Sequence, residues 1–287
     1  MKISVLGPLL GFEGPLSEQL APLLPAHSAD LASVDACDVA VYGQILWAHP
    51  SVEASLLELS RRYASLQRPV VVVLVDDFDG LYPKTPNLRL LRTSLRRSKK
   101  RRNEAAFPFL WGAFPEAFET TDPGPLPSVG FCGMVSKHRV RLVSVLESSP
   151  LVQTQFIKRT TFLAGEVRDR DVVQDFRENL RMNAFNVCNR GAGNFSIRFY
   201  QALSAGRIPV LVDTDLELPL RKLIPWHECC VIEPTEERCL SAVVNLHRSG
   251  QIPTMQRRAR ELYDQFLTGS TFLEYVFEFL LRTGRMP

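Results

Sequence analysis

The 287-residue chain contains no apolar run of the roughly 18 residues that a bilayer-spanning helix needs. Its first 16 residues, MKISVLGPLLGFEGPL, carry only a short apolar run, and Gly7, Pro8 and Gly11 interrupt it. A secretory signal has a longer uninterrupted apolar region, so this start is atypical of one. We therefore expect a soluble, cytoplasmic protein that at most touches a membrane from its surface.

Cysteine is scarce and has no pattern that binds metal. The six cysteines are Cys37, Cys132, Cys188, Cys229, Cys230 and Cys239. None has the paired spacing of a zinc site, and the adjacent Cys229 and Cys230 cannot readily bond to each other. We expect reduced, mostly buried thiols, which suits a reducing compartment.

Excess charge of one sign is also lacking. The formal net charge is +3, which does not by itself indicate a nucleic-acid-binding protein. The 45% hydrophobic and 23% charged content is that of a globular protein, and the length suits one large or two ordinary domains.

The first half alternates short apolar runs with helical patterns. Strands are predicted over residues 2–7, 38–43 and 69–77, and helices over residues 17–24 and 50–66. The third run, PVVVVLVDD, is almost purely valine. Unbroken β-branched runs between helices are typical of a parallel sheet that helices cover on both faces.

The same alternation restarts after a proline- and glycine-rich stretch at residues 119–130, which we interpret as a linker. Strands are predicted over 129–135, 154–163, 184–189 and 229–233, and helices over 137–148, 172–183, 235–249, 254–267 and 271–283. We predict an α/β protein with two Rossmann-like domains that face each other across a cleft. The domains are residues 1–125 and 126–270, and residues 271–287 form a helix that packs back on the first.

The stretch GAGNFSIRFYQALSAGRIPVLVDTD (191–215) predicts a turn, a helix and a buried strand. Ser196 is a suitable N-cap, so the helix should begin at Ile197 and end at Gly206. Pro209 would lie one residue into the next strand. One face of the helix, with Phe199, Ala202 and Leu203, should pack on the sheet.

Polar residues gather where this helix begins. Asn194, Ser196, Arg198 and Gln201 lie at its start, the turn at Gly193 exposes backbone N–H groups, and Arg190 precedes the turn. Helix N-termini at the carboxyl edge of a parallel sheet bind anions through free N–H groups and the helix dipole. Because arginine adds a planar, permanently charged donor, we predict a phosphate site here.

The segment FNVCNRGAGNFSIRFYQALSAGRIPVLVDTDLELPL (185–220) resembles the signature of the exostosin family, inverting glycosyltransferases of the GT47 class. The matching residues are Arg190, Gly191, Ser196, Arg198, Ala202, Gly206, Ile208, Pro209, Val210, Leu218 and Pro219. The segment FCGMVSKHRVRLVSVL (131–146) resembles the first strand and helix of the family's donor domain, and weaker similarity reaches back to VVVVLVDDFDG.

This resemblance implies a GT-B fold and an inverting transfer from a nucleotide-sugar to a glycan or lipid-linked acceptor. We expect a UDP-sugar donor and no obligatory metal ion. Arg190, Ser196 and Arg198 would contact the donor diphosphate, with Lys137, Arg139 and Arg141 as further candidates. The family has Glu where this chain has Gln201, which can still accept from a ribose hydroxyl through one oxygen.

Three alternatives remain open. The α1,3-fucosyltransferases of the GT10 class, also GT-B enzymes, carry a similar segment with Lys at the position of Arg198. The pair Asp77 and Asp79 mimics the motif with which metal-dependent GT-A enzymes bind Mn²⁺ or Mg²⁺. A non-enzymatic docking protein would act through the basic run SLRRSKKRR (94–102).

An inverting transfer also needs a base that removes the proton of the acceptor hydroxyl. Asp77, Asp79, Glu116 and His49 are candidates. We favour Asp79 because it ends a predicted strand at the edge where the cleft should lie.

Two further segments have a structural and a functional interpretation. The run at 94–102 has six basic residues in nine; it is a solvated face, or it binds anionic lipid or an acidic glycan. It lacks interleaved aromatic residues, so we do not expect a nucleic-acid partner. The aromatic segment at 105–118, which includes Trp111, is more typical of core than of a sugar-binding platform, and His227 has no second histidine at metal-ligand spacing.

Overall fold

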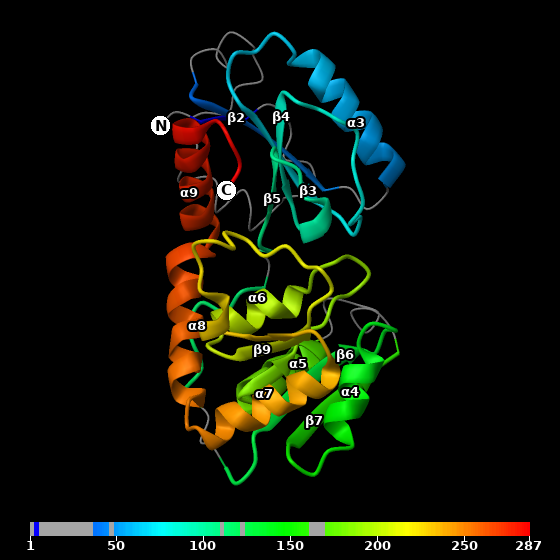
Figure 1. The fold of residues 1–287 in the computed structure, drawn as a ribbon, viewed down its shortest axis with the longest axis vertical. Coiled ribbons are helices and arrows are strands. Elements are labelled where there is room, and N and C mark those ends of the chain that lie inside the picture. Colours follow the sequence, from blue (N-terminus) through cyan, green and yellow to red (C-terminus); the bar gives the residue numbers. More distant parts are fainter. Residues whose placement is uncertain (1–2, 6–36, 46–48, 110–111, 121–123, 161–169) are drawn as a thin grey trace.

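The computed structural model describes residues 3–5, 37–45, 49–109, 112–120, 124–160 and 170–287. It contains two parallel sheets of five strands each, one above the other in Figure 1. This confirms the α/β class with parallel sheets. The helix expected at residues 17–24 and the aromatic residue Trp111 lie outside the described residues.

The first sheet has the strand order β1-β2-β3-β4-β5. Its strands are β1 (Ile3–Val5), β2 (Val39–Ile45), β3 (Val70–Val75), β4 (Leu88–Arg92) and β5 (Glu104–Ala106). Helix α3 (His49–Arg62) packs on one face, against Val70 and Val72 of β3. The alternate residues Val71 and Val73 belong to the core on the other face. The valine run is therefore buried throughout, as expected of a central parallel strand.

Strands β4 and β5 were not predicted from the sequence. Both carry charged residues into the sheet: Arg92 and Glu104 are almost completely buried and form an ion pair of 3.3 Å. The Arg92 guanidinium also donates to the carbonyl oxygens of Phe78 and Gly80. Since the two charges pair inside the fold, both strands can be buried although charged residues interrupt their apolar sequence.

The second sheet has the order β10-β9-β8-β6-β7. Its strands are β6 (Ser128–Met134), β7 (Gln153–Arg159), β8 (Phe185–Val187), β9 (Ile208–Val212) and β10 (Val231–Glu233). Four helices follow strands of this sheet: α4 (Val140–Glu147), α5 (Arg170–Met182), α6 (Ile197–Ser204) and α7 (Glu236–Arg248). The start of α6 at Ile197 and the strand position of Pro209 agree with the sequence prediction.

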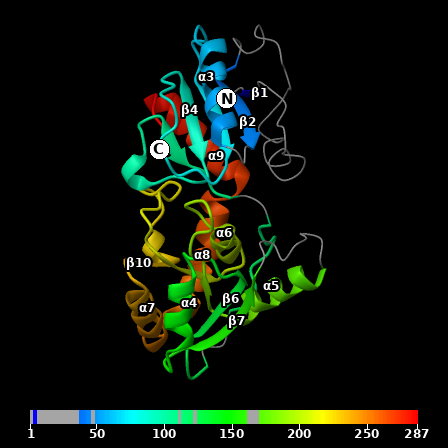
Figure 2. The same ribbon diagram turned by 90° about the vertical axis from the view of Figure 1, so that its right-hand side faces the viewer.

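Helices α8 (Ile252–Phe266) and α9 (Gly269–Thr283) run along one side of both sheets (Figures 1 and 2). Helix α9 packs on the first sheet, where the ring of Phe272 meets that of Phe107 edge-on at 5.7 Å. One hydrophobic cluster includes Val73 and Phe107 of the first half together with Phe199 of the second. The two halves therefore share a core across their junction.

All six cysteines are buried and free, in agreement with the expectation that the thiols are mostly buried. Among the described residues, no helix combines the length and the apolar character that crossing a bilayer requires.

Candidate functional site

The second sheet reverses its strand order between β6 and β8, because the chain goes from β6 outward to β7 and then returns to the other side of β6. Ligands of open α/β sheets bind at such a point, beyond the carboxyl ends of the strands. Helix α4 follows β6, and helix α6 follows β8, so the loops before both helices lie at this edge. Arg139 lies at the N-cap of α4, and Arg198 lies in the first turn of α6.

Arg139 and Arg198 donate only to backbone carbonyls. Arg139 is 4% exposed; its Nε donates to the oxygen of Asn189 (3.2 Å) and its Nη1 to that of Met134 (3.0 Å). Arg198 is partly buried, and its Nε donates to the oxygen of Cys132 at 2.8 Å. In the part of the chain that the structure describes, neither guanidinium forms an ion pair with a carboxylate.

The guanidinium groups of Arg139 and Arg198 both have lowered pKa values. Burial and the charge of Arg198 lower the pKa of Arg139 to about 10, and burial lowers the pKa of Arg198. Because an arginine guanidinium is permanently charged, the fold keeps two positive charges near each other in a poorly solvated place. Buried charges are ordinarily paired, and an anionic ligand would supply the missing partner.

Ser196 lies at the N-cap of α6 with extended backbone angles, as predicted, but its hydroxyl makes no capping hydrogen bond. The side chain is 6% exposed, and its Oγ has no partner among the described residues. Nε of Arg190 is also buried without a partner among the described residues. Ser196 and Arg190 both line a cavity of about 10 Å³. That volume admits about one water molecule or one ligand oxygen.

Three residues expected to bind the donor make contacts between the two halves in this structure. The backbone N–H of Gly193 donates to Oδ1 of Asp77 (3.0 Å), and Nη1 of Arg190 donates to Oδ2 of Asp79 (3.0 Å). The backbone N–H of Asn194 donates to the hydroxyl of Ser94 at 2.8 Å. The loop after β8 is therefore fixed to the first sheet in this structure.

Asp79, the favoured base, is bound by two arginines. Its Oδ2 also accepts from Nε and Nη2 of Arg96, at 2.9 and 2.8 Å. Burial alone would raise the pKa of Asp79, but the hydrogen bonds and charges of Arg96 and Arg190 outweigh it and lower the pKa. A carboxylate stabilised in this way is a weaker proton acceptor.

The other candidate residues are spread more widely. Lys137 is exposed near Arg139, whereas Arg141 pairs with Glu236 and Glu237 on the surface. The amide of Gln201 lies against Gly112 in the segment that precedes the second half. Glu116 is exposed, and the side chain of His49 lies outside the described residues. His138, which sequence reasoning missed, lies near Arg139, Arg190 and Asp79.

Much of the basic run at 94–102 pairs with acids of the loop after β9. Arg97 pairs with Asp213 (2.7 Å), and Lys100 pairs with Glu217 (3.0 Å). The hydroxyl of Ser98 donates to Asp215. Residues 96–100 and 213–217 therefore form an electrostatic contact between the halves, while Lys99 and Arg102 are exposed.

The aromatic segment at 105–118 is mainly core. Phe107 and Phe109 are buried, and Phe109 stacks on Phe195 of the second half at 5.8 Å. Phe114 and Phe118 are partly buried and pack against the same core. The core interpretation agrees with the structure for these four rings.

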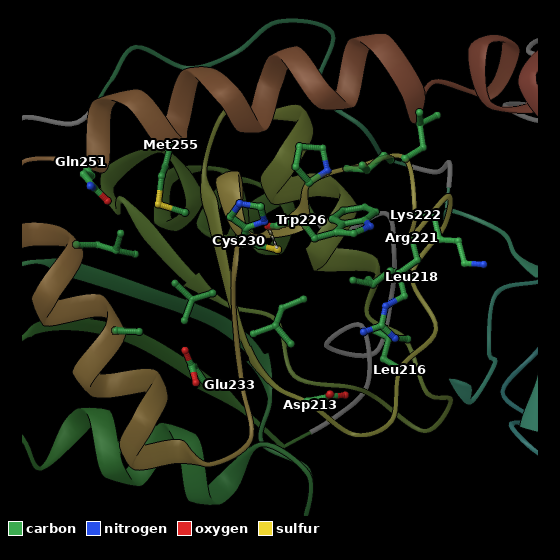
Figure 3. Close-up of a pocket in the computed structure, with 18 of the residues that line it drawn as sticks. Asp213, Leu216, Leu218, Arg221, Lys222, Trp226, Cys230, Glu233, Gln251 and Met255 are labelled. Atoms are coloured by element: carbon green, nitrogen blue, oxygen red, sulfur yellow. Dashed lines mark hydrogen bonds between the residues drawn. The ribbon is translucent and has the colours of Figure 1, made fainter. Parts of the chain in front are cut away.

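A larger hollow of about 890 Å³ lies beside the carboxyl ends of β9 and β10 (Figure 3). Trp226, Arg221 and Lys222 line it together with residues of α7 and α8. The indole N–H of Trp226 is buried without a partner among the described residues. Leu216 separates this hollow from the small cavity at Ser196, since it lines both.

No protein-family model matches the chain. Part of it is similar to the exostosins: 31% identical over 98 residues to Exostosin-1b of Danio rerio and 30% over 108 residues to Exostosin-1 of Bos taurus. These matches cover 33% and 35% of this chain but only 13% and 14% of the relatives. The chain is thus exostosin-like over about a third of its length.

The whole chain superposes on the lipopolysaccharide outer core galactosyltransferase WaaB, with a TM-score of 0.55 and 11% identity. The superposition covers 98% of this chain and 100% of WaaB. This chain has a GT-B fold. The finding confirms the expected fold class and overturns the GT-A alternative, which requires a different architecture.

Within the GT-B fold, the point where the second sheet reverses its order carries Arg139, Arg198 and Ser196. The loop after β3 of the first sheet, with Asp77 and Asp79, faces it. The geometry therefore brings Asp77 and Asp79 of the first half to Gly193 and Arg190 of the second.

Proposed function

We propose that this protein is an inverting glycosyltransferase that transfers a sugar from a nucleotide-sugar, with UDP as the expected nucleotide, to a hydroxyl of a glycan or glycoconjugate. The observation that carries the proposal is the pair of arginines at the point where the sheet reverses, the buried Arg139 and the partly buried Arg198, which have no carboxylate partner among the described residues. The exostosin-like segment and the GT-B fold support it.

In the proposed reaction the diphosphate lies against Arg139, Arg198 and the hydroxyl of Ser196. Negative charge grows on the leaving diphosphate in the transition state, and preorganised donors stabilise it there. The two arginines supply the positive charge that stabilises the diphosphate, so the proposed reaction has no obligatory metal ion. EDTA should therefore leave the activity unchanged, whereas loss of activity in EDTA would overturn this part of the proposal.

The direct test is a thermal-shift panel of UDP, GDP, CMP and dTDP, followed by their sugars. A nucleotide at a hundredfold excess over its Kd should stabilise the protein by about 2.7 kcal/mol. Stabilisation by one nucleotide identifies the donor class, and the fucosyltransferase-like alternative predicts GDP. No stabilisation by any of the four would overturn the proposal.

For the compartment we propose the cytoplasm, supported by six free, buried thiols, which suit a reducing environment.

A peripheral contact with anionic lipid is a second proposal, and it rests on the exposed Lys99 and Arg102. Co-sedimentation with phosphatidylserine vesicles tests it, and the variant with Lys99→Gln and Arg102→Gln should stay in solution. The same variant tests the non-enzymatic docking alternative, because glycosyl transfer should survive it.

A further inference from the structure

Two carboxylates of one loop, Asp77 and Asp79, are in different environments. Asp79 is partly buried and accepts from the guanidinium groups of Arg96 and Arg190. Asp77 is exposed, and its carboxylate accepts through Oδ1 from the backbone N–H of Gly193 at 3.0 Å. Among the described residues, the Oδ2 atom of Asp77 has no hydrogen-bond partner.

We propose that Asp77 is the catalytic base, which takes the proton of the acceptor hydroxyl through Oδ2, and that Asp79 fixes the loop to the second half through Arg190. This reverses the sequence-based preference for Asp79, and it rests on the proposed glycosyl transfer. An arginine-bound carboxylate is a poor proton acceptor, whereas Asp77 is oriented by one neutral donor and keeps its second oxygen open to solvent.

The position of Asp77 suits the reaction. Gly193 belongs to the loop that runs from Arg190 to Ser196 and into α6, so Asp77 lies beside the loop that would carry the donor. A Cβ at Gly193 would lie 2.7 Å from Oδ1 and 2.9 Å from Cα of Asp77. Only glycine therefore lets the two loops approach this closely.

A second contact fixes the same geometry. The hydroxyl of Ser94 donates to the backbone oxygen of Asp77 (3.1 Å) and accepts from the N–H of Asn194 (2.8 Å). Behind the loop, Asp76 accepts from the hydroxyl of Tyr82 at 2.6 Å and from the N–H of Phe78 at 2.8 Å. A site held by such supporting contacts needs little rearrangement during the reaction.

The step balances. An oxygen lone pair of the acceptor forms the bond to the anomeric carbon, and the hydroxyl proton goes to Oδ2 of Asp77. The bond from the anomeric carbon to the diphosphate oxygen breaks, and its electron pair stays on the diphosphate beside Arg139 and Arg198. Protonated Asp77 then releases its proton to solvent.

The test compares Asp77→Asn with Asp79→Asn and with Glu274→Gln, an exposed acid on α9. Asparagine keeps the acceptor for the Gly193 N–H and removes only the base, so the loop geometry should survive. Binding of UDP is measured by calorimetry. Turnover is measured as UDP release from UDP-glucose, UDP-galactose and UDP-N-acetylglucosamine, with water or oligosaccharides as acceptor.

We expect Asp77→Asn to lower kcat at least 100-fold, the usual range for loss of a general base, with the Kd for UDP changed less than twofold. Asp77→Glu should recover part of kcat, Asp79→Asn should mainly lower the melting temperature, and Glu274→Gln should match the wild type. If Asp77→Asn keeps more than a third of kcat, or if Asp79→Asn loses as much kcat at an unchanged melting temperature, the assignment is wrong. Failure of the wild type to bind any of the four nucleotides of the panel would instead overturn the proposed function itself.

Discussion

The guanidinium of Arg198 occupies the space that a side chain on Gly133 would fill. Gly133 is the penultimate residue of β6 and has a φ of 145°, and a Cβ built there would collide with Nη2 and Cζ of Arg198. Glycine is therefore required twice at this position, for its backbone conformation and for the approach of the arginine.

We predict that Gly133→Ala abolishes nucleotide binding by displacing Arg198. Gly250→Ala is the matched control, because Gly250 also has a positive φ (68°) but no atom lies near its Cβ position. Gly250→Ala should lose roughly 1 kcal/mol of unfolding free energy from backbone strain, and Gly133→Ala should lose more because its Cβ also collides with Arg198. Only Gly133→Ala should lose the thermal shift that nucleotide induces. An equal nucleotide-induced shift in both variants would refute the role of Gly133 in positioning Arg198.

A second prediction concerns the missing partner of Arg198. Arg198→Met keeps the length of the side chain and its packing on Phe131 but removes one of two neighbouring cations. Relief of that repulsion should offset the lost hydrogen bond to Cys132, so the melting temperature of the free protein should change little. The nucleotide-induced thermal shift should disappear.

The control for this variant is Arg248→Met, an exposed arginine at the end of α7. It should keep both the melting temperature and the nucleotide response. If Arg198→Met instead unfolds the protein, Arg198 is a structural residue and the anion-site interpretation loses its main support.

Local sequence patterns predicted the elements whose stability is local. The valine run gave β3, and the turn, cap and apolar face around Ser196 gave the start of α6 correctly. Strands β4 and β5 were not predicted, because their charged residues Arg92 and Glu104 pair with each other inside the sheet. Such a pair looks like surface sequence until its partner is known.

Ser196 and Arg198 lie at the start of α6, where the sequence placed them, and Arg139 became a candidate through the exostosin resemblance. That these residues bind a donor stays a prediction. No local rule indicates that the loop from Arg190 to Asn194 bonds to the first sheet, since its partners are about 100 residues away in the chain. Long-range pairing of this kind decides which donors remain free for a ligand.

A third prediction concerns the ion pair between Arg190 and Asp79, which crosses between the halves and is mostly buried. A double-mutant cycle with Arg190→Met and Asp79→Asn should give a coupling energy of about 1–3 kcal/mol. Asp79→Asn should destabilise more than loss of an exposed pair would, because it leaves the guanidinium of Arg190 buried without its carboxylate, whereas Arg190→Met leaves Asp79 paired with Arg96. The pair Lys158 and Glu147, exposed on the second domain, is the control and should give less than about 1 kcal/mol.

The last prediction concerns pH. Burial and the nearby charges of Arg190, Lys137 and Arg139 lower the pKa of His138 from its ordinary value of 6.5, and the charge of Asp79 opposes them. As the pH falls through 6.5, the unfolded chain therefore takes up this proton before the folded chain does. The free energy of unfolding should be retained above pH 6.5 and decline below it, and His138→Gln should remove that part of the decline.

Nucleotide binding should reverse the shift in the pKa of His138, because a diphosphate beside Arg139 brings negative charge that favours the imidazolium. By linkage, UDP should bind more tightly as the pH falls toward 6, and His138→Gln should flatten this dependence. A titration of the imidazole resonances by NMR with and without UDP measures the shift directly. An unchanged pKa of His138 on saturation with UDP would show that the diphosphate does not lie beside Arg139.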